Sequence, residues 1–104
     1  MPFPPKQNHR IPLDAAAAMT RRYRNESKGG EIAQMFPKED LESLLSQAGA
    51  AGIRFYFGRA SEGGPMGLVA VAVDKEGNDM ANQILIDFGY PCPPFCSSTN
   101  PLNS

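Results

Sequence analysis

The pattern of hydrophobic and polar positions predicts a first helix that begins at residues 11–14 and ends at Gly29-Gly30. Pro12 is tolerated in the first helical turn, and Asp14 favours the positive end of the helix dipole. Glycines end helices because they readily adopt the left-handed conformation of a C-cap. The apolar face that we expect this helix to present contains Leu13, Ala16, Met19 and Tyr23.

A second helix is predicted by the clearest helical period in the chain. It begins at Pro37, which suits a first helical turn, and ends at Gly49, which suits a C-cap. One face has the i, i+3, i+4, i+7 spacing and contains Leu41, Leu44, Leu45 and Ala48. We expect this face to pack on a sheet. Residues 31–36, just before the helix, favour neither helix nor strand.

Three segments in the second half of the chain have the character of β-strands. Residues 53–58 alternate, so that Ile53, Phe55 and Phe57 face one way and Arg54 and Tyr56 the other. Residues 68–73 are apolar on both faces, which is typical of a central strand. Residues 80–88 contain branched apolar side chains and favour a third strand, although Gly89 would also suit the end of a helix.

These elements predict an α+β fold, with two helices packed on one face of a small antiparallel sheet of about three strands, arranged as a β-meander. Prolines cluster at both ends of the chain, so both ends should be extended. We therefore predict a flexible arm in residues 1–10 and a single α+β domain in residues 11–90. Residues 91–104 are predicted to be a Cys/Pro-rich tail packed on that domain.

Composition and charge narrow the classes of function. Hydrophobic residues make up 41% of the chain and charged residues 20%, which is ordinary for a soluble protein. No apolar run reaches the length of a membrane span, and the N-terminus lacks a signal pattern, so we expect a cytoplasmic, bacterial protein without membrane contact. Residues 1–28 are basic, but the isoelectric point of about 5.7 is far from that of nucleic-acid binders, which makes nucleic acid an unexpected partner.

Both cysteines lie in the segment Cys92-Pro93-Pro94-Phe95-Cys96, where the prolines prevent a helix. The favoured interpretation is a structural clasp, in which Cys92, Phe95 and Cys96 fill an apolar groove with or without a disulfide. A dithiol redox site and a metal site are the alternatives. A zinc site needs about four ligands, and the chain offers two thiols and one histidine. We accordingly expect no bound metal and no cofactor.

Arg54 and Tyr56 are the best candidates for a binding surface. They share one sheet face, which is open to water or to a partner if the helices cover the other face. Arginine suits carboxylates and phosphates, and both residue types are enriched at protein interfaces. The alternative is an ordinary cross-strand pair between Arg54 and an aspartate or glutamate.

No combination of residues in the chain has the pattern of an enzyme's catalytic apparatus. Residues 58–67 are rich in glycine but lack the Lys-Ser/Thr ending of a phosphate-binding loop. We predict a small non-catalytic binding module that presents the Arg54–Tyr56 face to a protein or a small anionic ligand, with a homodimer as a further possibility. The alternative function is a thiol redox or metal-binding protein that uses Cys92 and Cys96.

Several motifs resemble those of a group of small bacterial proteins of roughly this length. The motifs are Ile11-Pro12-Leu13 with Tyr23-Arg24, Leu44-Leu45 before Gly52-Ile53-Arg54-x-Tyr56-x-Gly58, Val73-Asp74-x-x-Gly77-Asn78-Asp79, and Cys92-Pro93-Pro94-x-Cys96 with Asn100-Pro101-Leu102. The resemblance spans residues 11–102. No activity is attached to this group, so the resemblance implies no catalytic residue in this chain.

Overall fold

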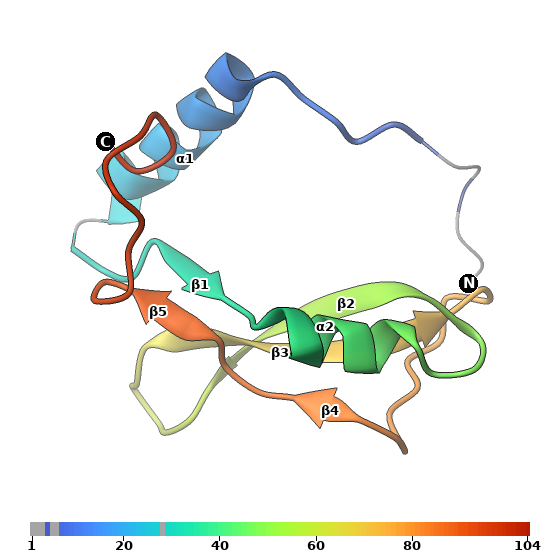
Figure 1. The fold of residues 1–104 in the computed structure, drawn as a ribbon. Coiled ribbons are helices and arrows are strands. Elements are labelled where there is room, and N and C mark those ends of the chain that lie inside the picture. Colours follow the sequence, from blue (N-terminus) through green and yellow to red (C-terminus); the bar gives the residue numbers. More distant parts are fainter. Residues whose placement is uncertain (1–3, 5–6, 28) are drawn as a thin grey trace. The chain divides into compact units, whose positions relative to one another are not determined.

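The computed structural model describes residues 4, 7–27 and 29–104 of the chain (Figure 1). These residues form two helices and two small antiparallel sheets, which confirms the predicted α+β class. The elements are α1 (Leu13–Ser27), β1 (Ala33–Met35), α2 (Lys38–Leu45), β2 (Ala50–Arg59), β3 (Met66–Asp74), β4 (Leu85–Ile86) and β5 (Tyr90–Cys92).

The chain divides into two compact units. The first, which we call the sheet unit, comprises residues 1–6 and 36–89 and contains α2, β2, β3 and β4. The second, which we call the terminal unit, comprises residues 7–35 and 90–104 and contains α1, β1 and β5. Half of the predicted N-terminal arm, residues 1–3, 5 and 6, lies outside the described residues. The predicted domain boundaries stay predictions.

The sheet unit contains an antiparallel meander in the order β2-β3-β4, as the sequence predicts. β2 and β3 pair from Arg59 opposite Met66 to Ala50 opposite Asp74. The predicted third strand is confirmed but short, because only β4 pairs regularly with β3 in the stretch 80–88. Before β4, the chain returns along the end of β3, where the amide of Met80 donates to the carbonyl of Ala72 at 2.9 Å.

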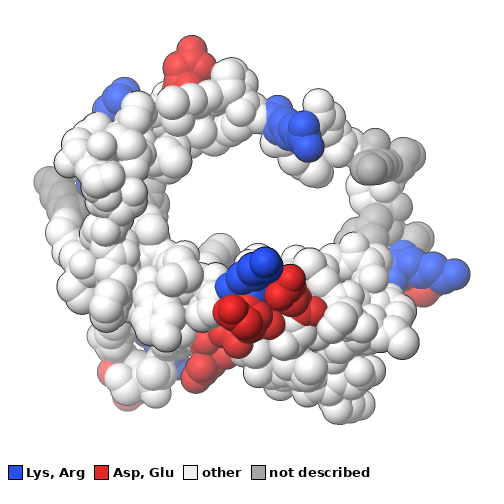
Figure 2. Space-filling model, in the orientation of Figure 1, with Lys and Arg blue, Asp and Glu red and all other residues white. Residues whose placement is uncertain are grey.

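Helix α2 packs on one face of this sheet. Leu44 is fully buried in a cluster with Ala70 and Ala72 of β3. Ala70 pairs with Phe55 and Ala72 with Ile53, so the helix covers the face that the alternation assigned to the apolar side chains of β2. The sequence of α2 contains Glu39, Asp40 and Glu42, and Figure 2 shows Asp and Glu side chains gathered in this part of the molecule. Two of them, Glu39 and Asp40, lie in the first helical turn, where the helix dipole favours negative charge.

Within the sheet unit, the other face of the sheet is covered by side chains rather than by a helix. Val71 and Val73 of β3 are only 2% exposed, although no helix lies over them within the sheet unit. At one end, the ring of Phe88 lies against the cross-strand pair Gly58–Gly67. A Cβ atom at Gly67 would lie 2.7 Å from the nearest atoms of that ring, so only glycine leaves room for it.

The terminal unit is built around β1 and β5, which pair antiparallel with Ala33 opposite Cys92. These strands resolve the ambiguity of residues 31–36 in favour of a strand. The guanidinium of Arg24 in α1 donates to the backbone oxygens of Leu102 and Ser104 at 2.6 and 2.5 Å, which ties the C-terminal turn to the helix.

Within the terminal unit, the predicted apolar face of α1 is largely exposed. Within the described part of the helix only Ala17 is buried, while Leu13, Met19 and Tyr23 are exposed. In the terminal unit, Met19 and Tyr23 of this face line a small hollow with Ile32 and Leu102. Packing of this face on the three-stranded sheet stays a prediction.

Candidate functional site

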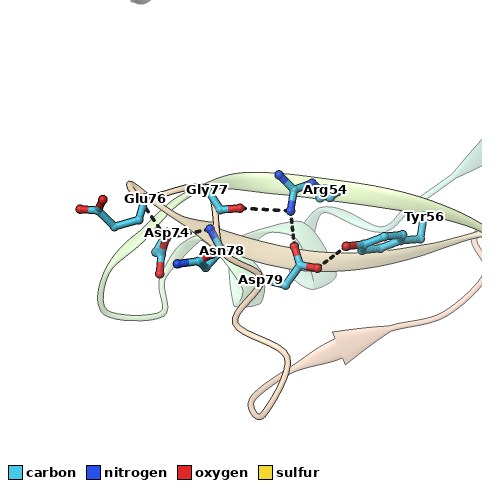
Figure 3. A network of polar contacts seen from close by, with 7 residues as sticks. All are labelled: Arg54, Tyr56, Asp74, Glu76, Gly77, Asn78 and Asp79. Atoms are coloured by element: carbon cyan, nitrogen blue, oxygen red, sulfur yellow. Dashed lines mark hydrogen bonds and ion pairs between the residues drawn. The ribbon is translucent and has the colours of Figure 1, made fainter. Parts of the chain in front are cut away.

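The turn after β3 positions an acidic side chain beside Arg54 and Tyr56 (Figure 3). Asp74 Oδ1 accepts hydrogen bonds from the amides of Glu76 and Asn78, at 2.9 and 3.0 Å. Gly77 has φ 86°, a left-handed conformation that glycine adopts at low cost. The turn sends the chain back so that Asp79 pairs with Val73, on the same sheet face as Arg54 and Tyr56.

Asp79 joins the two predicted site residues into one network. Its Oδ1 is 2.5 Å from Nη1 of Arg54, and its Oδ2 accepts a hydrogen bond from the hydroxyl of Tyr56. The same Arg54 nitrogen also donates to the carbonyl of Gly77 at 3.3 Å. Arg54 and Tyr56 lie on β2 and Asp79 lies beyond β3, so the network crosses over β3 (Figure 3). We infer that these side chains shield Val71 and Val73.

The network is electrically balanced. The hydrogen bond from Tyr56, with the Arg54 guanidinium beside it, holds the pKa of Asp79 below its ordinary value of 3.8. The hydrogen bond to Asp79 raises the pKa of Arg54 above its usual range. Both groups are therefore charged at neutral pH and neutralise one another, so the ordinary Arg–Asp pair considered above is present.

This pKa shift predicts a pH-dependent stability. A carboxylate whose pKa is lower in the folded than in the unfolded protein stabilises the fold above the unfolded pKa, and this contribution is lost as the pH falls through the folded pKa. We expect Asp79→Asn to lower Tm above about pH 5, and the difference from wild type to shrink below pH 3.8. Thermal melts from pH 2 to 7 measure this difference in Tm. Tyr56→Phe should make the pH dependence of the difference smaller, because it removes the hydrogen bond that is the largest cause of the lowered Asp79 pKa. A difference that is independent of pH would contradict the prediction.

β2 exposes three consecutive aromatic side chains, of which Tyr56 lies on the face of this network and Phe55 and Phe57 lie on the opposite face. Phe57 is the most exposed at 78%, while Phe55 is partly covered by Phe36, with ring centroids 5.4 Å apart. β2 is also an edge strand, since β3 is its one strand neighbour among the described residues. An edge strand presents unpaired backbone donors and acceptors to an incoming strand.

The two cysteines are joined by a disulfide in the terminal unit. Cys92 is buried in β5, with 5% of its surface exposed, whereas Cys96 is exposed. Phe95 is 61% exposed and packs edge-on against Tyr90. Of these three residues, only Cys92 is buried in the terminal unit, and packing of the tail over the three-stranded sheet stays a prediction. No group of three or more potential metal-ligating side chains occurs among the described residues.

A small hollow lies between α1 and the C-terminal turn in the terminal unit. Its volume is about 200 Å³, and it is lined by Met19, Thr20, Tyr23, Arg24, Ile32 and Leu102. Ligand pockets usually have volumes of about 300–1,000 Å³. The guanidinium of Arg24 is also occupied by two backbone oxygens, so this hollow is not a candidate binding site.

The sequence interpretation missed Asp79, which completes the network. The sequence contains a signal for it, because Gly77-Asn78 favours a tight turn and a tight return places Asp79 opposite Val73. Side chains directly opposite in an antiparallel pair share a face. The strand register from Val73 across β3 to β2 would therefore have put Asp79 on the Arg54 face.

In the described part of the chain, no helix is both long and apolar enough to cross a membrane. Comparison with known proteins finds no matching family model, no similar curated protein and no similar solved structure. The resemblance to the group of small bacterial proteins stays a prediction.

Proposed function

We propose that this protein is a small non-catalytic interaction module that binds a partner protein through β2, with Arg54 and Tyr56 in the contact. The observation that carries the proposal is the run of exposed aromatic side chains on an edge strand, next to a fixed Arg–Asp–Tyr network. Tyrosine and arginine are enriched among the residues that dominate binding energy at protein interfaces.

The network supports this role because it holds two contact residues in place before binding. Asp79 bonds both Arg54 and Tyr56. Immobilising a flexible side chain at an interface costs about 0.5–1.5 kcal/mol, and a side chain that is already ordered avoids most of this cost. The tyrosine ring and the arginine stem are then available as an ordered, partly apolar surface.

The charge balance favours a protein over a small anion as the partner. Asp79 neutralises Arg54, so an anion would have to compete with a carboxylate that is already in contact. A protein strand could instead use the exposed backbone groups of the β2 edge together with the aromatic side chains. A second copy of the chain is one such partner, because the same edge is present on both molecules.

Immobilised protein incubated with bacterial lysate tests the proposal. Tyr56→Ser, Phe57→Ser should reduce retention of wild-type partners by about tenfold or more, since truncating contact aromatics typically costs the most binding energy. The matched control is Phe95→Ser, which removes an exposed aromatic from the terminal unit and should leave retention unchanged. The proposal fails if the folded β2 variant retains the same proteins, in the same amounts, as wild type, and if gel filtration shows the same oligomeric state for both.

A further inference from the structure

We propose that the Cys92–Cys96 disulfide is a site of thiol–disulfide exchange, in which an external dithiol attacks Cys96 and Cys92 is the leaving and resolving thiol. This site lies in the terminal unit, whereas the β2 surface lies in the sheet unit. Exchange at this disulfide is therefore independent of partner binding by β2, and the two proposals are tested by separate experiments.

The two sulfur-bearing residues differ in their surroundings. Cys92 is only 5% exposed and lies in β5 opposite Ala33. Its carbonyl accepts a hydrogen bond from the amide of Ile32 at 2.8 Å, which fixes its backbone. Cys96 is exposed and follows the turn after β5. The disulfide thus has one buried, anchored end and one accessible end.

Access decides which sulfur is attacked. In thiol–disulfide exchange a thiolate attacks one sulfur of the disulfide and expels the other, so rates depend on which sulfur the nucleophile can reach. The strand pairing around Cys92 hinders the approach of an external thiolate to this residue, while Cys96 faces solvent. The same asymmetry makes Cys92, rather than Cys96, the sulfur that leaves.

The exchange balances with a dithiol as the reductant. One thiolate of the dithiol forms a bond to Cys96 Sγ, the Cys92–Cys96 bond breaks, and its electron pair goes to Cys92 Sγ, which takes a proton from water. The second thiolate of the dithiol then attacks the first sulfur of the same dithiol, which is bonded to Cys96 in the mixed disulfide. Cys96 leaves as a thiolate. The protein gains two electrons, and the dithiol becomes a cyclic disulfide.

The short loop makes the exchange reversible. The Cα atoms of Cys92 and Cys96 are 4.7 Å apart, and the amide of Phe95 donates to the carbonyl of Pro91 at 2.9 Å. Two prolines further restrict the chain between the cysteines. Because the loop is short and restrained, little entropy is lost when the thiols meet again. Cys92 can therefore displace a thiol bound to Cys96 and close the disulfide again.

Trapping with glutathione tests the assignment on the unmodified protein. Folded protein is treated briefly with excess glutathione, quenched with acid, alkylated and mapped by peptide mass spectrometry. We expect about tenfold or more glutathione on Cys96 than on Cys92, because only Cys96 is accessible. The matched control is the same reaction in denaturant, where both sulfurs are open and the adduct should divide evenly. A folded protein that gives no adduct, an even division, or an excess on Cys92 would overturn the proposal.

Single variants give an independent readout. In Cys92→Ser the remaining thiol is exposed, and in Cys96→Ser it is buried. We expect the folded Cys92→Ser protein to reduce an aromatic disulfide dye about tenfold or more faster than Cys96→Ser, with a ratio near one after unfolding. A ratio near one in the folded proteins, or faster reaction of Cys96→Ser, would show that neither sulfur has the assigned role.

Discussion

Replacing Leu44 by alanine is expected to destabilise the protein by about 3 kcal/mol, within the range for fully buried leucines. Leu44 is the largest fully buried side chain among the described residues, and it packs against Ala70 and Ala72 of β3. These alanines are too small to move into the cavity that the substitution leaves. Urea unfolding followed by far-ultraviolet circular dichroism measures the change.

The neighbouring residue provides the control for this prediction. Leu45 lies on the same helix but is 52% exposed, so Leu45→Ala should cost much less than Leu44→Ala. If both variants unfolded at the same urea concentration, α2 would not be packed on the sheet through Leu44.

Replacing Gly67 by alanine is the second substitution with a large expected effect, a loss of about 2 kcal/mol. The new Cβ would lie 2.7 Å from ring atoms of Phe88, closer than Cβ atoms approach other groups in proteins. The ring must then move away from the sheet and lose its contact with Gly58. Thermal or urea unfolding of the variant checks this result.

The glycine on the neighbouring strand supplies a matched control. Gly58 is paired with Gly67, but a Cβ there would make ordinary contacts, at 3.7 Å to Val69 and 3.8 Å to Phe88. Gly58→Ala should therefore leave stability nearly unchanged or raise it slightly, because alanine restricts the unfolded chain. Equal losses in the two variants would contradict the close packing of Phe88 on Gly67.

Much of the sheet unit could be predicted from the sequence because its elements have strong local patterns. The leucine spacing in α2 and the alternation in β2 can each be read from the residues of that one element alone. β3 is apolar from Leu68 to Val73 and is flanked by turn residues, and the turn at Gly77 depends on local chemistry. Physical rules that act over a few residues were sufficient here.

The terminal unit was harder to predict because it depends on pairing between distant parts of the chain. β1 and β5 have three residues each, too few for a period, and β5 contains Pro91, which is rare in strands. Each of these strands forms only by pairing with the other, and more than half of the chain separates them in sequence. The partner of α1 could not be predicted for a related reason, since the helical period identifies an apolar face but not what covers it.

The candidate site was partly predictable. Alternation placed Arg54 and Tyr56 on one face, and the structure shows both bonded to Asp79. The alternation within β2 does not identify Asp79 as the residue that bonds them, because Asp79 lies on the far side of β3. Whether β2 binds a partner protein is the central claim, and it stays a proposal.

Hydrogen–deuterium exchange of the protein, alone and with the partner that wild type retains, tests that claim most directly. We predict slower exchange in β2, residues 50–59, when the partner is bound, because its edge amides become paired. β3 should change little, since it already has a strand on either side. Slower exchange confined to other elements, with β2 unchanged, would contradict the proposal that β2 is the binding surface.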